Sequence, residues 1–383
     1  MSTTAVTPRD LDYSLDAARI ATHPAEPRDS ARMLVVHRAE DRVEHRSVRD
    51  IVEYLEPAGA LIVNETRVEA MRFLAERDGD GRTCEGLFVD SSEDGLWRVM
   101  MRGAKHFDCG DVLCLMPPQR GVNEALPVRV RMERRDGAHW LVSLCDGLSA
   151  VAVWSAAGWT PLPPYILAAR QQRGESQEAA ADRADRSEYQ TVYARASDRP
   201  SCAAPTAGMH FTQGLLQQIE ARGIETIRTE LQVGPGTFRP VDAPTLGTHP
   251  MHAERCRVTA AALCALDRCD CAASLVVGTT SVRLLESLPR PLPTNALDRA
   301  HDLIAAGQGD RAVLDFTTDI LIAPGSSFRW TNRLLTNFHL PRSTLLALVG
   351  ALVGLDRLKQ IYALAQREQY RFYSFGDAML ILP

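Results

Sequence analysis

The 383-residue sequence lacks a long hydrophobic run. Its longest nearly apolar segment, residues 345–355, covers about eleven residues and contains two glycines, whereas a membrane-spanning helix needs roughly 20 apolar residues. The opening segment, residues 1–8, is polar and does not have the pattern of a secretory signal. The sequence therefore predicts a protein without a membrane span, and we expect it in the cytoplasm.

An excess of positive charge is also missing, because the formal net charge is −5 at pH 7. The chain as a whole therefore does not indicate nucleic-acid binding, which would need a local basic face. Composition is otherwise ordinary for a globular protein, with 45% hydrophobic and 24% charged residues. A chain of this length is long enough for two or three domains.

The nine cysteines include no Cys-x-x-Cys pair. Four of them fall within residues 256–271, but their spacings match no regular zinc or iron–sulfur pattern. His249, His252 and Glu254 imitate a zinc motif, yet Pro250 breaks any helical register between the two imidazoles. We therefore expect no metal site.

Residues 74–144 alternate between apolar and polar positions, and turn signals rich in Asp and Gly interrupt them. This pattern is typical of a small all-β barrel or sandwich. The candidate strands are 84–89, 96–101, 111–115, 126–132 and 139–144.

Helical and strand patterns alternate in the rest of the chain, which predicts an α/β fold. The expected strands are 61–64, 224–233, 275–277 and 378–382, and the expected helical segments are 213–221, one starting near residue 281, and 345–366. The simplest architecture is an α/β catalytic domain, residues 1–67 plus 151–383, with an inserted small β-barrel domain at residues 68–150. Residues 168–187 form either an exposed helix or a mobile loop.

Four segments interleave Gly or Pro with polar residues beside an apolar run: 205–212, 233–238, 278–283 and 336–344. In the first, Thr212 is a suitable N-cap for the following helix, whose free N–H groups would face a loop carrying His210. In the third, Gly278 and the residues after it stand between a buried strand and a helix, which suits a carboxylate or ribose cradle or a simple N-cap turn. Four such loops look like the walls of one site.

Together these segments resemble the S-adenosylmethionine:tRNA ribosyltransferase-isomerase family of queuosine biosynthesis. Two long sequence motifs, TNFHLP at 336–341 and GDAMLI at 376–381, appear in the same order as in the family. The matching stretches are 27–32, 64–68, 161–166, 189–194, 203–212, 233–241, 251–254, 277–287, 336–346 and 370–381.

The resemblance implies an α/β domain with an inserted β-barrel, and a reaction in which S-adenosylmethionine is the substrate and no further cofactor is needed. Its ribosyl moiety would pass to the amine of 7-aminomethyl-7-deazaguanine at the wobble position of a tRNA. Epoxyqueuosine-tRNA would form, with release of adenine and methionine. The implied partners are that tRNA and S-adenosylmethionine, and we expect a monomer.

Such a reaction needs a base beside the sulfonium carbon, an acid to help adenine leave, a neutral amine and a cleft for the methionine carboxylate. Imidazoles suit the proton transfers because they titrate near neutrality. The expected catalytic residues are His210, His252, Glu254, His339 and Asp377. The expected substrate-binding residues are Tyr165, Thr206, Gly208, Gly234, Gly236, Thr237, Phe238, Thr279, Thr280, Ser281, Arg283, Asn337 and Arg371. The aromatic residues that could stack on adenine or face the sulfonium are Tyr165, Phe211, Phe238 and Phe338.

For the tRNA, the candidate phosphate partners are Arg67, Arg72, Lys105 and Arg342, and binding should weaken as salt rises. The chain departs from the family pattern at Gln232, where His is usual, and at Glu65, where Asp is usual. Two alternatives remain open: an S-adenosylmethionine-binding enzyme with another acceptor or with lyase activity, and a noncatalytic RNA-binding protein.

Overall fold

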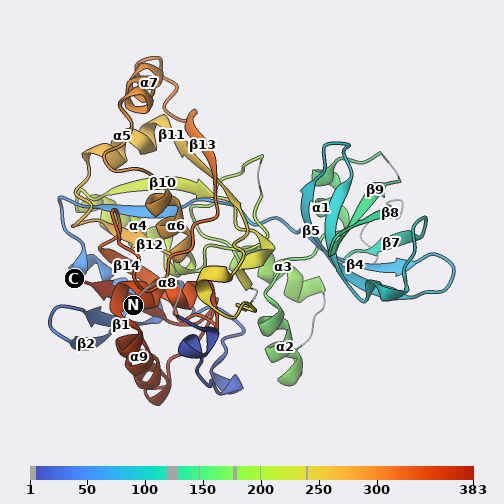
Figure 1. Cartoon of the computed structure of the whole chain (residues 1–383), viewed down its shortest axis with the longest axis horizontal. Coiled ribbons are helices and arrows are strands. Elements are labelled where there is room, and N and C mark those ends of the chain that lie inside the picture. The colour runs from blue at the N-terminus through green and yellow to red at the C-terminus, as the bar shows by residue number, and fades with distance from the viewer. Residues whose placement is uncertain (1–5, 119–127, 146, 176–178, 199, 239) are drawn as a thin grey trace.

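A computed structural model describes residues 6–118, 128–145, 147–175, 179–198, 200–238 and 240–383, except the side chains of Ala179, Thr237 and Phe238. Two sheets organise the chain: a nine-stranded sheet and a closed six-stranded barrel, which lie side by side in Figure 1. This arrangement confirms the predicted fold class, an α/β protein with a small β-barrel.

The nine-stranded sheet has the order β13-β11-β10-β3-β12-β14-β15-β1-β2. Four central neighbours, β10, β3, β12 and β14, run parallel, so their carboxyl ends meet at one edge. The strands are β1 (Arg32–His37), β2 (Arg42–Ser47), β3 (Ala60–Asn64), β10 (Glu225–Leu231), β11 (Glu254–Thr259), β12 (Leu275–Val277), β13 (Ala312–Thr318), β14 (Arg333–Asn337) and β15 (Ala378–Leu382).

Helices cover both faces of this sheet because its central strands are apolar on both sides. Within β3, Ile62 packs into one core with helices α5 to α9, while Leu61 and Val63 pack into a second core with α4. These helices are α4 (Gln213–Ala221), α5 (Ala260–Arg268), α6 (Thr279–Ser287), α7 (Thr294–Ala305), α8 (Thr344–Val353) and α9 (Leu355–Arg367).

The expected helices and strands of this part are present, with small differences at their ends. Thr212 caps α4 as predicted, since its hydroxyl accepts a hydrogen bond from the Leu215 N–H at 3.1 Å. The helical segment 345–366 divides into α8 and α9 at Gly354, whose φ of +86° is a left-handed conformation that glycine adopts without strain.

The barrel closes in the order β4-β5-β6-β9-β8-β7. All five candidate strands of this region are found, although residues 126 and 127 lie outside the described part, and a sixth strand that the periodicity did not separate, β4, completes the closure. The strands are β4 (Arg72–Arg77), β5 (Thr83–Ser91), β6 (Trp97–Arg102), β7 (Val112–Met116), β8 (Arg129–Asp136) and β9 (His139–Leu144).

Helix α1 (Ala150–Ala157) follows the barrel and packs on it. Trp154 stacks on Trp97 of β6, with ring centroids 4.3 Å apart. The barrel core therefore includes a helix from beyond residue 150. The division of the chain into domains at 1–67, 68–150 and 151–383 stays a prediction.

For residues 168–187, the prediction left open an exposed helix or a mobile loop, and the described part is mostly helical and mostly exposed, except for a few buried positions. Two helices, α2 (Pro164–Gln172) and α3 (Ala179–Glu188), are held together there by a buried ion pair. Arg170, 2% exposed, donates to both carboxylate oxygens of Asp185 at 2.7 and 2.8 Å. The sequence pattern missed this because both charges point inward, toward each other.

Short 3-10 helices connect the larger elements: η2 (Pro8–Leu11), η3 (Ala17–Arg19), η4 (Arg28–Ser30), η5 (Val48–Tyr54), η6 (Ala104–His106), η7 (Thr206–His210), η8 (Pro235–Phe238) and η9 (Leu246–Thr248). Among the described helices, none has both the length and the apolar character required to cross a membrane.

Candidate active site

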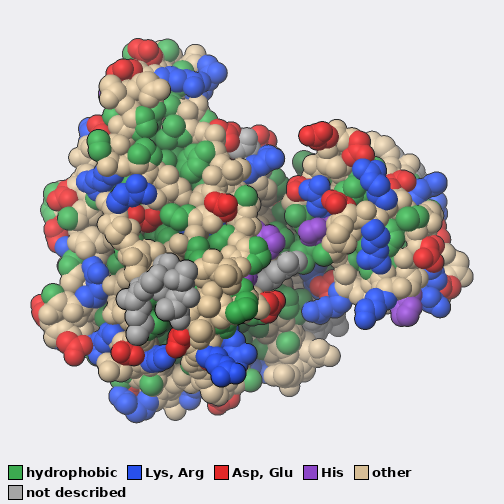
Figure 2. All heavy atoms as spheres, in the orientation of Figure 1, with side chains coloured by type: hydrophobic (Ala, Val, Ile, Leu, Met, Phe, Trp, Pro, Cys, Tyr) green, Lys and Arg blue, Asp and Glu red, His purple; other side chains and the backbone are tan. Residues whose placement is uncertain are grey.

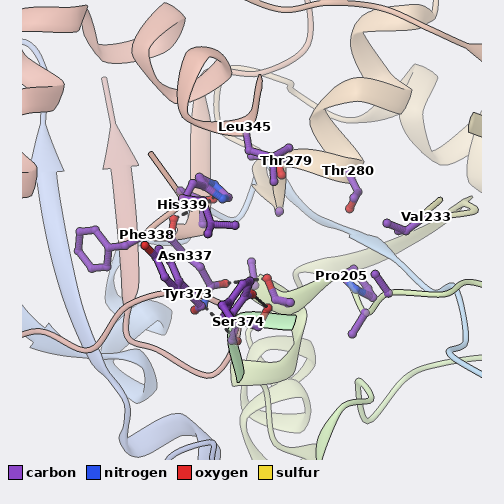
Figure 3. Close-up of a pocket in the computed structure, with 18 residues that line it drawn as sticks. Pro205, Val233, Thr279, Thr280, Asn337, Phe338, His339, Leu345, Tyr373 and Ser374 are labelled. Atoms are coloured by element: carbon purple, nitrogen blue, oxygen red, sulfur yellow. Dashed lines mark hydrogen bonds between the residues drawn. The ribbon is translucent and has the colours of Figure 1, made fainter. Parts of the chain in front are cut away.

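Three of the four predicted loops surround one small hollow at the carboxyl ends of the parallel strands (Figure 3). The fourth loop contributes only its first residue, Val233, at the end of β10. The space enclosed is about 50 Å³, far less than the roughly 300–1,000 Å³ of small-molecule pockets. The lining comes from 203–207, 278–280 and 336–340, with Tyr165, Val233, Leu345, Tyr373 and Ser374.

Asn337 joins two walls of the hollow to each other. It lies at the end of β14, and its amide nitrogen donates to the Tyr373 carbonyl at 3.1 Å and lies 3.3 Å from Nε2 of His210. Its amide oxygen accepts from the Thr206 hydroxyl at 3.3 Å. One buried amide therefore connects η7, β14 and the turn before β15.

His339 lines the hollow, and its orientation is fixed from two sides. Its Nε2 lies 2.8 Å from the Thr336 hydroxyl, and its backbone N–H donates to the Tyr362 hydroxyl at 2.8 Å. Burial lowers the pKa of His339 to about 3 because the charged imidazole would lose its hydration. The ring is therefore neutral at pH 7.

His210 is buried behind Asn337 and is not part of the lining. Burial lowers its pKa to about 3, and the positive charges of Arg371 and Arg28 lower it further. The premise that these imidazoles titrate near neutrality therefore does not hold for either His210 or His339 in the folded chain. Sequence reasoning missed this because it had no measure of burial.

At the start of α6, Thr279 and Thr280 line the hollow, but Ser281 does not. Ser281 is fully buried, and its hydroxyl donates to the Val277 carbonyl at 2.7 Å, four residues back along the chain. This hydrogen bond joins the first turn of α6 to the end of β12. The Ser281 hydroxyl is thus used within the fold.

The fourth loop faces a second and larger cleft, about 1,020 Å³, between the barrel and the sheet. Figure 2 shows a groove between these two parts of the surface. Gly234 and Gly236 line this cleft, together with His252, which is exposed, and Glu254, which is buried. The Gly234 N–H donates to Oε1 of Glu254 at 3.1 Å, and Oε2 of Glu254 pairs with Arg283.

Asp377 and Arg371 bind each other and lie outside the lining of both cavities. Asp377, 2% exposed, accepts from the Arg371 backbone N–H at 2.8 Å and from its guanidinium at 3.1 Å. It also accepts from the Arg32 N–H at 3.2 Å. These contacts order the turn that precedes β15.

Of the aromatic candidates, Tyr165 lines the hollow, and its hydroxyl lies 2.5 Å from that of Ser374. Phe211 is fully buried in the second core. The Phe338 ring packs against Phe372, 4.8 Å between centroids, and points away from the hollow in Figure 3. The side chains of Thr237 and Phe238 lie outside the described part of the chain.

Of the four expected phosphate partners, Arg67, Lys105 and Arg342 are exposed, whereas Arg72 is buried, 8% exposed, at the start of β4. Three of them pair with carboxylates: Arg67 with Glu69, Arg72 with Glu85 and Arg342 with Asp12. Lys105, on η6 of the barrel, is exposed.

Gly208 is needed for close packing of η7. A Cβ atom at this position would lie 2.0 Å from the Tyr193 hydroxyl oxygen and 3.0 Å from Cγ2 of Thr191. Both neighbours belong to the segment 189–194, which shared the family pattern. Gly208 therefore shapes the wall of the hollow from behind.

Several lining residues were not singled out from the sequence. Tyr373 and Ser374 lie within the turn that Asp377 closes with Arg371. Tyr362 of α9 is outside the lining and fixes the backbone of His339 from behind. Tyr373 has a φ of +72°, which is uncommon for residues other than glycine and marks the position as special in the structure. A backbone angle cannot be read from the sequence, so this mark was not accessible to the sequence analysis. Within the described residues, no group of three or more His, Cys, Asp or Glu side chains is arranged to hold a metal ion.

Comparison with known proteins places this site in a family. Residues 8–381 match the family described as queuosine biosynthesis protein. The S-adenosylmethionine:tRNA ribosyltransferase-isomerase of Moorella thermoacetica is 40% identical over 375 residues, which cover 97% of this chain and 99% of the relative. The enzyme of the same name from Parvibaculum lavamentivorans is 40% identical over 377 residues, 97% of this chain and 98% of the relative.

A solved structure is also similar: the crystal structure of S-adenosylmethionine tRNA ribosyltransferase from Thermotoga maritima. It is 27% identical, covers 97% of this chain and 100% of its own, and has a TM-score of 0.48. The chain belongs to the queuosine biosynthesis protein family.

Proposed function

We propose that this chain is an S-adenosylmethionine:tRNA ribosyltransferase-isomerase. It transfers and isomerises the ribosyl moiety of S-adenosylmethionine onto 7-aminomethyl-7-deazaguanine at the tRNA wobble position, giving epoxyqueuosine-tRNA, adenine and methionine. The observation that carries the proposal is the meeting of three distant loops around His339 at the strand ends, in a chain that matches relatives of this name along almost its whole length. S-adenosylmethionine is the substrate, and no further cofactor is required.

His339 is the residue best placed to move a proton, because it lines the hollow and is neutral at pH 7. A neutral imidazole can accept the proton that the positive sulfur acidifies on the neighbouring carbon. His210 acts as a positioning residue, since it reaches the hollow only through Asn337. Asp377 likewise orders Arg371 and the turn around it.

The substrate must extend beyond the small hollow, because about 50 Å³ holds little more than water. The adjoining large cleft is the route by which both S-adenosylmethionine and the tRNA nucleotide would enter. His252 is exposed in this cleft and is available to the acceptor amine. For the tRNA backbone, we retain the exposed residues Arg67, Lys105 and Arg342 as candidates, leave out Arg72 because it is buried against Glu85, and propose a cytoplasmic monomer.

The test is to incubate the purified protein with S-adenosylmethionine, with and without tRNA that carries 7-aminomethyl-7-deazaguanine. Release of adenine and methionine only with that tRNA supports the proposal. Release without RNA would instead indicate lyase activity, and binding of tRNA without any turnover would indicate a noncatalytic RNA-binding protein. Formation of S-adenosylhomocysteine would indicate methyl transfer.

A further inference from the structure

Arg283 presents two hydrogen-bond donors that none of the described residues uses. It lies one turn inside α6 and is 6% exposed. Its Nη1 pairs with Glu254, but within the described part of the chain its Nε and Nη2 are buried without a hydrogen-bond partner. Buried polar groups are rarely left unpaired, and an unpaired charged donor is costly. The arrangement points to a ligand at that edge of the guanidinium.

The two unused donors have a definite geometry. The Nε–H and Nη2–H bonds of a guanidinium lie on one edge and point in the same direction, which matches the two oxygens of a carboxylate. Lysine has no such edge, since its ammonium group is a single charged point. The free edge of Arg283 is therefore built for a planar, bidentate anion.

A third unused group lies on the same side of α6. Among the described residues, none forms a hydrogen bond with the buried hydroxyl of Thr280, and residues three apart on a helix are neighbours. Thr280 lines the small hollow, where it lies near Val233 in Figure 3. Both side chains belong to the first turns of a nine-residue helix, whose N-terminal dipole favours negative charge.

Glu254, the partner of Arg283, lines the large cleft together with Gly234, whose N–H donates to it. The residue before Gly234, Val233, lines the small hollow that contains His339. Arg283 itself is not part of either lining, and it is connected to the cleft through Glu254 and to the hollow through Thr280, one turn before it on α6. The ligand, with its reacting end facing His339, would reach Arg283 along Thr280. A zwitterionic amino-acid group suits this position because Glu254 offers a negative charge beside the positive edge.

We propose that Arg283 binds the carboxylate of the methionine part of S-adenosylmethionine through Nε and Nη2, with the Thr280 hydroxyl beside it. Glu254 is the positioning residue: it holds Nη1 and so turns the free edge toward the substrate. This assignment deepens the proposed function and depends on it. It gives Glu254 a role in orienting Arg283 in place of proton transfer.

The first test uses the unaltered protein and equilibrium binding. S-adenosylmethionine is compared with its decarboxylated form, which keeps the sulfonium, the ribose and the adenine. We expect the decarboxylated form to bind about 10- to 100-fold more weakly, as lost bidentate contacts to a charged group would produce. Equal affinities would overturn the assignment without touching the proposed reaction, which is scored separately by adenine release from S-adenosylmethionine and tRNA.

The second test locates the contact. Arg283→Ala and Arg283→Lys should lose most of the preference for the carboxylate, so that each binds the two compounds within about threefold of each other. Arg257→Ala is the matched control, because Arg257 lies on β11, the same strand as Glu254, but pairs with Glu230 and Asp198 instead of Glu254. Its preference should stay at the wild-type value. An Arg283 variant that keeps the full preference would overturn the assignment.

The role of Glu254 is tested with Glu254→Gln. The amide of Gln keeps an oxygen that can accept from the Gly234 N–H, but it is uncharged and therefore holds the Arg283 guanidinium more weakly. We expect a partial loss of the preference for S-adenosylmethionine over its decarboxylated form. The loss should fall on the KM for S-adenosylmethionine more than on kcat, because Glu254 positions Arg283 and moves no proton in this assignment. A loss of turnover of 100-fold or more with normal substrate affinity would instead make Glu254 a proton-transfer residue.

Discussion

At the scale of single residues, burial controls the chemistry of this site more than residue type does. His210 and His339 have the side chain that titrates nearest to neutral pH, yet both are buried and both have a pKa of about 3. Between the folded pKa and the unfolded pKa, the buried histidine stays neutral in the folded protein, whereas the same side chain binds a proton in the unfolded chain. Each of these two histidines therefore makes the folded state less stable as the pH falls below about 6.5, the unfolded pKa.

The acid stability of the protein should report this burial. The folded pKa of His339 is below the unfolded value of about 6.5, so its contribution to stability is complete above pH 6.5 and is lost as the pH falls toward 3. Each such group adds about 1.4 kcal/mol per pH unit in that window. When the pH is lowered from 6 to 5, the free energy of unfolding should fall by about 1 kcal/mol more in the wild type than in His339→Gln. Urea denaturation at the two pH values measures this difference.

His301→Gln is the control for that measurement, because His301 is an exposed imidazole on α7. It should follow the wild-type pH dependence. If His339→Gln also follows the wild type, the imidazole of His339 is accessible to protons in the folded protein, and the buried environment described above is wrong.

The two buried histidines should differ in their effect on turnover. His339 lines the hollow, so His339→Gln should slow adenine release by about 100-fold or more, the usual size of a lost acid–base group. His210 acts through Asn337, and His210→Gln should cost roughly tenfold or less. Single-turnover kinetics with saturating S-adenosylmethionine distinguishes the two; an equal loss for both would remove the distinction.

At the scale of elements, the loops are held by packing from behind as much as by their own sequence. Gly208 lies in η7 against Tyr193, whose buried hydroxyl oxygen has no hydrogen-bond partner in the part of the chain that the structure describes. Periodicity predicted the helix α4 and its cap at Thr212, since both are local. It could not predict that a tyrosine fifteen positions before Gly208 would occupy the space where a side chain would go.

Gly208→Ala should therefore disturb the hollow. The added Cβ would lie 2.0 Å from the Tyr193 hydroxyl oxygen, and overpacking of this kind costs about 1–3 kcal/mol. We expect a lower urea midpoint and weaker S-adenosylmethionine binding. Tyr193→Phe removes the clashing oxygen, so the double variant should recover part of both losses, while Tyr193→Phe alone should be close to the wild type. A double variant no better than Gly208→Ala would place the clash elsewhere.

At the scale of the whole molecule, the large cleft depends on how the barrel meets the sheet. Helix α1 lies beside this junction: Trp154 stacks on Trp97 inside the barrel core, while Trp154 and Val151 also line the cleft. The barrel is thus stabilised by a helix that the predicted boundary at residue 150 assigned to the other domain. The two parts of the chain share this element.

Trp154→Ala should weaken the barrel first. Loss of a buried tryptophan costs about 3–5 kcal/mol, and here it also removes the stacked pair with Trp97. In calorimetry of the full chain we expect an early transition for the barrel and a smaller shift for the sheet. Val151→Ala is the control, because Val151 is on the same helix but 76% exposed. One transition that shifts as a whole would show that the chain unfolds as a single unit.

The sequence by itself determined what is local. Alternation of period two predicted five of the six barrel strands, and Thr212 predicted the start of α4, whereas the division of 345–366 into α8 and α9 was not predicted. Polar residues beside apolar runs marked the loops that line the hollow, because each of these signals depends on neighbours along the chain.

Only the tertiary structure decided which of those residues share a site. It buried His210 and His339, used Ser281 and Asp377 for internal hydrogen bonds, and brought Glu254 of β11 to Arg283 of α6. The physical reason is that desolvation and the pairing of charges depend on distances between segments that are far apart in sequence. No local pattern encodes those distances.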